Sequence, residues 1–308
     1  MPKVTIVIST YDRPEYLPSA IRSVLDQTFQ DFGIIIFDSG SNYDIRSLIS
    51  SFNDSRITLQ TSEQVINGME NFKRIFSFKY ESEYLMVFHD DDIMHPQLIE
   101  RELILMEKDS SLVWVGTSLN FVHDDAKMNN FCKLNELKKF KICDSFDLVR
   151  LLLHNFPLAY NTVMYRSTFV TNVDDIFPVY YKWSDRPFLI NLSKKGKVAV
   201  IEEKLVNYRI HHGQDSYGKD KKNLPYLLNL CNYYKDNLPL PLNTTDEKLF
   251  YMWSSNNLLK VLSDFCDNFK AYLNLVIDCR KNGLIRISCL NFRGIWYVLN
   301  VFKKYFFN

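Results

Sequence analysis

The sequence is poor in the residues that interrupt regular structure, and it has no excess of charge of either sign. Its 308 residues include 9 glycines and 10 prolines, and 37 Lys and Arg stand against 36 Asp and Glu. Few Gly and Pro, together with 23 Phe and 18 Tyr, argue against a disordered chain and for a packed globular protein. The balanced charge provides no field that would attract nucleic acid, so we expect no nucleic-acid partner.

Cysteine motifs and long apolar runs are missing as well. The six cysteines lie far apart, without a Cys-x-x-Cys pair or the spacing of a zinc site. No apolar run approaches the ~20 residues of a membrane span. The sequence also enters an apolar segment at Val4 without the apolar stretch of a secretory leader. These absences favour a reduced, cytoplasmic protein.

The first 110 residues alternate between short apolar runs and segments with a helical apolar stripe. We expect buried strands at 4–8, 34–37, 56–60 and 84–88. Strands that alternate with helices form a mostly parallel sheet with helices on both faces. The sequence therefore predicts an α/β fold with a Rossmann-like sheet. It contains no Gly-x-Gly-x-x-Gly and no Walker motif, so dinucleotide oxidoreductases and P-loop enzymes are poorly supported.

After residue 110 the alternation weakens, and further strands are expected at 117–123, 162–166, 197–201 and 205–210. From about residue 221 the pattern becomes helical. We therefore expect one domain over 1–220, with a nucleotide-binding half at 1–110 and an acceptor half at 111–220, followed by a helical C-terminal region at 221–308.

The last segment, 286–308, predicts an amphipathic helix. One broad face collects its apolar side chains: Ile295, Val298, Leu299, Val301, Phe302, Tyr305 and Phe306. The other face collects polar and basic ones: Arg293, Asn300, Lys303 and Lys304. Such a helix lies in a membrane interface, packs on its own domain or forms a dimer contact, and amphipathicity alone does not distinguish these outcomes.

Three consecutive acids, Asp90, Asp91 and Asp92, follow the expected strand at 84–88 and His89. Residues at the carboxyl end of such a strand face the crevice where α/β sheets bind ligands. Adjacent carboxylates repel one another unless a cation or several donors hold them, and hard oxygen ligands suit Mg²⁺ or Mn²⁺. The alternative is an acidic turn that caps the following helix.

Several separated motifs resemble glycosyltransferase family 2, whose members have the GT-A fold. They are Val4-Thr-Ile-Val-Ile-Ser-Thr-Tyr-Asp-Arg-Pro-Glu-Tyr-Leu17, Phe37-Asp-Ser-Gly-Ser41, Tyr84 to Pro96, Trp183-Ser-Asp-Arg-Pro-Phe-Leu189 and Leu205-Val-Asn-Tyr-Arg-Ile-His211. The resemblance covers about 3–216. It implies an inverting transferase that moves a sugar from a nucleoside-diphosphate sugar, UDP foremost, to a hydroxyl of a glycan or polyprenyl-linked acceptor in bacterial surface-glycan synthesis.

The resemblance also implies a nucleotide site at the strand ends. The positions that match the family's nucleotide-binding residues are Thr10, Tyr11, Arg13, Asp38, Ser39, Gly68 and Asp90. The ring of Tyr11 could stack on the base. Ser39 stands where the family more usually has Asp, so thymidine and guanosine donors stay open beside UDP.

A divalent cation, Mn²⁺ or Mg²⁺, is the implied cofactor, and Asp91, Asp92 and His211 match its ligands. His89 occupies the position of the family's usual first Asp. This offset makes Asp91 the strongest candidate for direct contact with the ion.

The implied catalytic base is Asp185, which would take the proton from the attacking hydroxyl. Its alternative role is that of a first-turn acid stabilised by the helix dipole. Trp183 and Ser184, immediately before it, are weaker candidates for contact with the acceptor or the sugar, and Ser184 stands where Glu is common.

Two other functions stay open. Ser39, His89 and Ser184 depart from the family pattern, as in an inactive relative that only binds a nucleotide sugar or a glycan. A sugar nucleotidylyltransferase would need a Gly-rich loop after the first strand, and residues 9–14 lack it. We expect a cytoplasmic protein, peripheral on the inner face of the membrane through 286–308, and the sequence does not indicate its oligomeric state.

Overall fold

The structure, a computed structural model, describes residues 1–306 except 124, 132, 135–138, 171–175 and 215–222. The chain forms two compact units. Unit 1 comprises 1–144, 157–175 and 189–214, and unit 2 comprises 145–156, 176–188 and 215–308. Two internal segments thus belong to the same compact unit as the C-terminal helices. The functional division at residue 220 stays a prediction, because compactness does not show which part binds which substrate.

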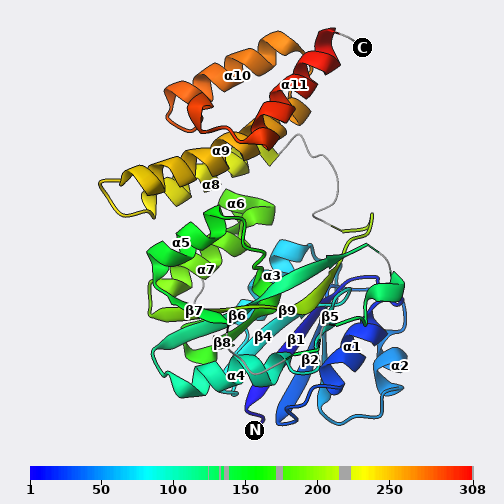
Figure 1. Cartoon of the computed structure of the whole chain (residues 1–308). Coiled ribbons are helices and arrows are strands. Elements are labelled where there is room, and N and C mark those ends of the chain that lie inside the picture. Colours follow the sequence, from blue (N-terminus) through cyan, green and yellow to red (C-terminus); the bar gives the residue numbers. More distant parts are fainter. Residues whose placement is uncertain (124, 132, 135–138, 171–175, 215–222, 307–308) are drawn as a thin grey trace. The chain divides into compact units, whose positions relative to one another are not determined.

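Unit 1 is built on one mixed sheet (Figure 1). Its strands are β1 (Val4–Thr10), β2 (Phe32–Asp38), β3 (Ile57–Thr61), β4 (Tyr84–His89), β5 (Ile93–Met94), β6 (Leu112–Val122), β7 (Phe140–Cys143), β8 (Val163–Arg166) and β9 (Lys197–Arg209). They lie in the order β3-β2-β1-β4-β8-β6-β9-β5, and β7 pairs with β9. The first four are mutually parallel, and β8 runs antiparallel to both β4 and β6.

Helices follow the parallel strands, as the alternation predicts. They are α1 (Leu17–Leu25), α2 (Ile45–Ser50), α3 (Gly68–Ser77) and α4 (Leu98–Lys108). In β1 the side chains of Val4, Ile6, Val7 and Ile8 are all fully buried, as expected for a strand covered on both faces. The predicted α/β fold, a mostly parallel sheet flanked by helices, is confirmed. One difference lies in β9, a single strand over both segments that the sequence analysis treats as separate strands.

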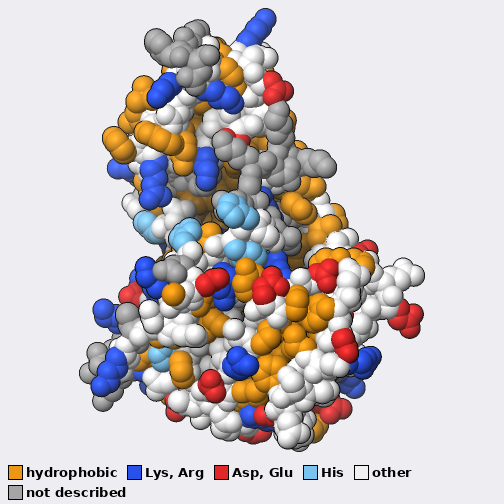
Figure 2. All heavy atoms as spheres, turned by 90° about the vertical axis from the view of Figure 1, so that its right-hand side faces the viewer, with side chains coloured by type: hydrophobic (Ala, Val, Ile, Leu, Met, Phe, Trp, Pro, Cys, Tyr) orange, Lys and Arg blue, Asp and Glu red, His pale blue; other side chains and the backbone are white. Residues whose placement is uncertain are grey.

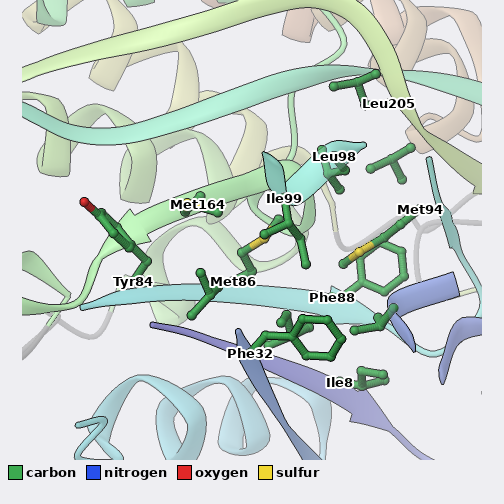
Figure 3. Close-up of a cluster of buried hydrophobic side chains, with 14 of the residues drawn as sticks. Ile8, Phe32, Tyr84, Met86, Phe88, Met94, Leu98, Ile99, Met164 and Leu205 are labelled. Atoms are coloured by element: carbon green, nitrogen blue, oxygen red, sulfur yellow. The ribbon is translucent and has the colours of Figure 1, made fainter. Parts of the chain in front are cut away.

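The core of unit 1 fixes the end of β4 (Figure 3). Met86 and Phe88 of β4 belong to one buried cluster with Leu98 and Ile99 of α4 and Leu205 of β9. Each of these side chains is at most 1% exposed, and burying one stabilises the fold by about 1.5–3 kcal/mol. The chain therefore leaves β4 at Asp90 from a rigidly packed base.

Unit 2 is helical. It contains α5 (Ser145–Leu153), α6 (Phe177–Tyr180), the start of α7 (Asp185–Ser193), α8 (Asn223–Asp236), α9 (Thr244–Phe265), α10 (Phe269–Lys281) and α11 (Phe292–Phe306). Arg150 of α5 donates from Nε to Asp246 Oδ1 of α9 at 2.8 Å and from Nη2 to Oδ2 at 2.9 Å. This two-bond ion pair holds the two helices together. The predicted helical C-terminal region is confirmed, and none of its described helices is long and apolar enough to cross a membrane.

Candidate functional site

The parallel register of unit 1 brings three strand ends to one edge of the sheet. Thr10 at the end of β1 pairs with Asp38 at the end of β2, and Ser9 pairs with His89 at the end of β4. Ligands of α/β proteins bind at this carboxyl edge. Side chains from three distant parts of the sequence can therefore meet in one site.

Asp90 is bound to the end of β1 and to the loop that follows it. Its Oδ2 accepts a hydrogen bond from Thr10 Oγ1 at 2.7 Å, and its Oδ1 accepts one from Arg13 Nη1 at 3.0 Å. The side chain is only 2% exposed. Burial raises the pKa of Asp90 to about 6, and the positive charge of Arg13 opposes this rise. The carboxylate thus depends on nearby positive charge to stay ionised.

Asp91 shares one oxygen between two basic side chains. Its Oδ2 accepts from Arg13 Nη1 at 2.7 Å and lies 3.0 Å from His211 Nε2. Its backbone carbonyl accepts from Arg209 Nε at 2.8 Å. Arg13 also donates from Nη2 to the carbonyl of Gly213, at 3.1 Å. The predicted residues Arg13, Asp91 and His211 therefore form one connected cluster.

Asp92 is held differently. It is completely buried, Asn161 Nδ2 donates to its Oδ2 at 2.7 Å, and the backbone N–H of Arg209 donates to its Oδ1 at 2.9 Å. Burial raises its pKa, and the neighbouring donors act in the opposite direction. Both oxygens are thus engaged by the protein, and Asp92 fastens the acidic loop to β9.

His89 joins this network from the last position of β4. Its Nε2 lies 2.7 Å from the hydroxyl of Tyr160, and its Nδ1 lies 3.2 Å from Asn161 Nδ2 and 3.4 Å from Asp92 Oδ2. The residue that departs from the family pattern is therefore part of a packed polar cluster around Asp92.

The donor atoms of this region fit a divalent cation. His89, Asp91 and Asp92 each offer one ligand atom, and these atoms lie within 4.8 Å of one another. His211 adds a second imidazole beside Asp91. Carboxylate oxygens suit Mg²⁺ and Mn²⁺, and imidazole suits transition metals, so this donor set is compatible with a divalent cation. The hydrogen bonds described above engage both carboxylate oxygens of Asp92 but only Oδ2 of Asp91.

Asp38 forms the second part of the site. Its Oδ1 accepts from the backbone N–H and the hydroxyl of Ser41, at 3.0 and 2.6 Å. Its Oδ2 is buried and has no hydrogen-bond partner among the described residues. Arg74 Nη1 donates to the carbonyl of Asp38 at 2.9 Å, so Arg74 braces the strand end. An unpartnered buried carboxylate oxygen is costly, and a ligand's N–H or O–H group would satisfy it.

Ser39 and Gly40 shape the turn after β2. The N–H of Ser39 donates to the carbonyl of Thr10 at 3.0 Å, which ties the two loops together. Gly40 has φ +91°, and a Cβ there would lie 2.9 Å from the carbonyl oxygen of Gln64. Only glycine fits this turn without strain.

The loop after β1 presents an exposed aromatic ring. Tyr11 is 42% exposed. The next residue, Asp12, has φ +51° and accepts from the N–H of Asn42 at 2.8 Å, while its own N–H donates to Ser41 Oγ at 2.8 Å. These bonds lock the loop against the turn after β2, and the ring of Tyr11 stays accessible.

Gly68 is the first residue of α3, after the helix-capping residue Asn67. The side chain of Asn67 accepts from the N–H groups of Met69 and Glu70, and the Glu70 side chain accepts from the N–H of Asn67. This reciprocal capping box fixes the start of the helix. No described bond joins Gly68 to the acidic cluster, and its nucleotide contact stays a prediction.

The predicted catalytic base belongs to unit 2. Asp185 begins α7, its carboxylate is 20% exposed, and its Oδ1 accepts from the N–H of Arg186 at 2.9 Å. Ser184 is buried, and its hydroxyl donates to the carbonyl of Tyr181 at 2.5 Å. The ring of Trp183 is half-buried, with Lys182 Nζ 5.6 Å from its centroid. The roles predicted for these residues stay predictions.

No sequence pattern indicates a role for Tyr160, Asn161 or Arg209. In the structure Asn161 and Arg209 donate to Asp92, and the hydroxyl of Tyr160 lies against His89. Asn161 contacts Asp92 across 69 residues of sequence, and Arg209 does so across 117. No local pattern indicates contacts of this length. Arg209 lies inside the last motif quoted above, and that is the one signal that could have found it.

Comparison with known proteins supports this description. The sequence model described as "Glycosyl transferase family 2" matches residues 5–159. The chain is 23% identical over 272 residues to an uncharacterized glycosyltransferase of Haemophilus influenzae, and the match covers 84% of each chain. The match to another curated relative covers 76% of this chain but only 33% of that relative's length.

A third relative has a more detailed name. Over 165 residues the chain is 30% identical to the UDP-Glc:alpha-D-GlcNAc-diphosphoundecaprenol beta-1,3-glucosyltransferase WfgD of Escherichia coli, which covers 51% of this chain and 64% of that protein. The crystal structure of S. aureus TarS in complex with UDP-GlcNAc matches with a TM-score of 0.56 and 11% identity, over 85% of this chain and 80% of the other. At this identity the likeness concerns the fold alone.

Proposed function

Because this chain belongs to glycosyl transferase family 2, we propose that it transfers a hexose or an N-acetylhexosamine from a nucleoside-diphosphate sugar to a hydroxyl of a glycan or lipid-linked acceptor, with inversion at the anomeric carbon. The observation that supports this most strongly is the cluster at the carboxyl edge of unit 1, where Thr10, Arg13 and His211 meet two of three consecutive acids. A divalent ion needs carboxylate ligands, and a diphosphate needs positive charge beside it, so a cluster of acidic and basic side chains suits the pair.

UDP is the first candidate for the nucleotide. The name of the E. coli relative specifies UDP-Glc, and the similarity covers half of this chain. The exposed ring of Tyr11 can stack on a base, and the unpartnered Oδ2 of Asp38 can accept from the base or the ribose. Because Ser39 stands where the family more usually has Asp, dTDP and GDP sugars are the alternative donors.

A divalent ion would be held by Asp91 directly, with His211, Asp92 and His89 as the other candidate ligands. A divalent ion, when bound, neutralises charge on the departing diphosphate. Asp92 holds the loop in place through Asn161 and Arg209. Arg13 already supplies positive charge to Asp90 and Asp91, and it is placed to exchange these partners for diphosphate oxygens.

Asp185 is the proposed base. Its partly exposed carboxylate stands at the first turn of α7. It would accept the proton of the acceptor hydroxyl as that oxygen attacks the anomeric carbon from the side opposite the leaving diphosphate. A lipid-linked acceptor, as in the name of the E. coli relative, would place the reaction at a membrane, and we propose its cytoplasmic face.

The test of this function replaces Asp185 with Asn. Turnover, measured as UDP released in the presence of a synthetic GlcNAc-diphosphate-lipid acceptor, should fall by about 10²–10⁴-fold, which is the usual contribution of a general base. UDP affinity, measured by calorimetry, should stay unchanged because the nucleotide site lies in unit 1. Asp278→Asn, an exposed acid on α10, is the matched control. Unchanged turnover in Asp185→Asn would remove Asp185 as the base.

One observation favours a second candidate, a protein that binds nucleotide sugar without transfer. Ser184 stands where the family often has Glu, and its hydroxyl is engaged by the carbonyl of Tyr181. A wild-type chain that binds UDP tightly but releases none from any donor and acceptor would support this candidate. The match to the transferase family argues against a nucleotidylyltransferase.

A further inference from the structure

The C-terminal helix α11 has two apolar sides. Its inner side packs on α9: Val301 is 1% exposed, and a Cβ at Gly294 would collide with the side chain of Asn256. The hydroxyl of Tyr305 donates to the carbonyl of Cys266 at 2.5 Å. This side of α11 belongs to the core of unit 2.

The other side of α11 carries large apolar side chains that the structure leaves in solvent. They are Phe292 (83% exposed), Ile295 (49%), Trp296 (52%), Leu299 (60%) and Phe302 (43%). Their spacing of three and four residues places them on one helix face. The apolar stripe predicted from the sequence is thus divided, with Val301 turned inward and Ile295, Leu299 and Phe302 turned outward.

The exposed stripe continues onto α10. The ring of Phe302 lies 5.1 Å from that of Phe269, measured between centroids. Leu273 and Ile277 follow Phe269 at four-residue intervals, and they are 44% and 41% exposed. We call the seven exposed residues the α10–α11 apolar surface: Leu273, Ile277, Phe292, Ile295, Trp296, Leu299 and Phe302. Figure 2 shows hydrophobic side chains among Lys and Arg side chains, with fewer Asp and Glu, at the upper end of its view.

The charge around this surface is mainly positive. On α10, Lys270, Arg280 and Lys281 stand against one acid, Asp278. Residues 286–308 contain Arg286, Arg293, Lys303 and Lys304, and no Asp or Glu. Lys303 follows Trp296 by two helical turns, so it emerges within the exposed apolar stripe, and the predicted place of Lys303 on the opposite face is wrong. Arg293 and Lys303 are exposed. Long basic side chains of this kind keep their charge in water while their stems lie on apolar surroundings.

We propose that the α10–α11 apolar surface docks into the interface of a membrane that contains anionic lipids. Aromatic and aliphatic side chains enter the boundary between headgroups and acyl chains, and flanking basic residues attract the anionic headgroups. Charge complementarity selects this occupant over a second copy of the chain, because two copies would bring like charges together. The inference goes beyond the transfer reaction, and its test needs neither donor nor acceptor.

The test uses the full-length protein and sedimentation with lipid vesicles. The protein should bind vesicles of phosphatidylcholine with phosphatidylglycerol and should bind pure phosphatidylcholine vesicles much more weakly. High salt should weaken the binding, because it screens the charge attraction. Trp296 reports the contact directly: its fluorescence should shift to shorter wavelength with anionic vesicles, and Trp296→Phe should remove that shift.

Point substitutions separate docking from folding. The double variant Trp296→Ser/Leu299→Ser should lose about tenfold or more in vesicle affinity. Lys303→Glu should lose about tenfold at low salt, because it reverses one charge. Both should keep the wild-type melting temperature. Val301→Ser, on the inner side, should instead lower the melting temperature. Ile104→Ser, at a position of α4 that is 49% exposed, is the control for loss of an exposed apolar side chain.

Two results would overturn the proposal. One is equal vesicle binding by the wild type and the double variant. The other is no binding to anionic vesicles, together with a concentration-dependent dimer in ultracentrifugation that the double variant abolishes. The second result would assign the surface to a second copy of the chain.

Discussion

Asp91 and Asp92 are neighbours in the sequence with different surroundings. Asp92 is fully buried, and its two oxygens accept from Asn161 and from the N–H of Arg209. Asp91 has one oxygen shared by Arg13 and His211. Asp92 therefore stabilises the loop, while Asp91 can bind a ligand.

This difference predicts opposite effects of two substitutions. Asp92→Asn places an NH₂ group against one of the two donors, so the free energy of unfolding should fall by about 2 kcal/mol or more. This corresponds to a fall in melting temperature of roughly 4–8 °C for a chain of this size. Asp91→Asn should leave the melting temperature unchanged or raise it, because it removes one charge from a crowded group of acids. Calorimetry of both variants, with the exposed Asp31→Asn as control, makes the comparison. Equal melting temperatures for Asp91→Asn and Asp92→Asn would contradict it.

At the scale of the element, α4 contains an unusual acid. Glu102 is fully buried, and its carboxyl oxygens have no hydrogen-bond partner among the described residues. Burial raises its pKa well above the usual value. The folded protein therefore binds this proton more tightly than the unfolded chain, in which Glu ionises near pKa ~4.3. The contribution of Glu102 to stability should therefore be greatest below that pH and should fall as the pH rises toward the raised pKa.

Glu102→Gln tests this element. The variant cannot ionise, so at pH 8 it should melt above the wild type by about 2–4 °C, which corresponds to about 1 kcal/mol. At pH 4.5 the advantage should become much smaller, because the wild-type side chain is then protonated in the folded protein and about half protonated in the unfolded chain. Melting curves at the two pH values measure the effect, with the exposed Glu81→Gln as control. An advantage of the same size at both pH values would show that ionisation of Glu102 does not limit stability.

Elements with a strong local pattern are the ones that the sequence predicts best. The runs at 4–8 and 84–88 specify β1 and β4, because continuous apolar residues need a sheet covered on both faces. The amphipathic pattern also predicts α11, but it does not say which apolar residues face the protein. Only the contact with α9 decides that Val301 is buried and Leu299 is not.

At the scale of the whole molecule, unit 1 carries the nucleotide and metal candidates, and unit 2 carries the proposed base and the proposed membrane surface. The sequence predicts the α/β sheet and the cluster of Arg13, Asp91 and His211, because the motifs mark the strand ends. It does not predict Asn161 or the role of Arg209, since contacts across 69 and 117 residues depend on the final packing.

The central claim is that this carboxyl edge binds a nucleoside diphosphate together with a divalent ion. Calorimetric titration of the full-length protein with UDP, dTDP and GDP, each with and without Mn²⁺, tests it most directly. We expect one of these nucleotides, UDP first, to bind in the presence of Mn²⁺ and to bind much more weakly with chelator. In Asp91→Asn the gain in nucleotide affinity that Mn²⁺ provides should be lost. Binding of none of the three, or binding that is equal with and without Mn²⁺ in both proteins, would contradict the account.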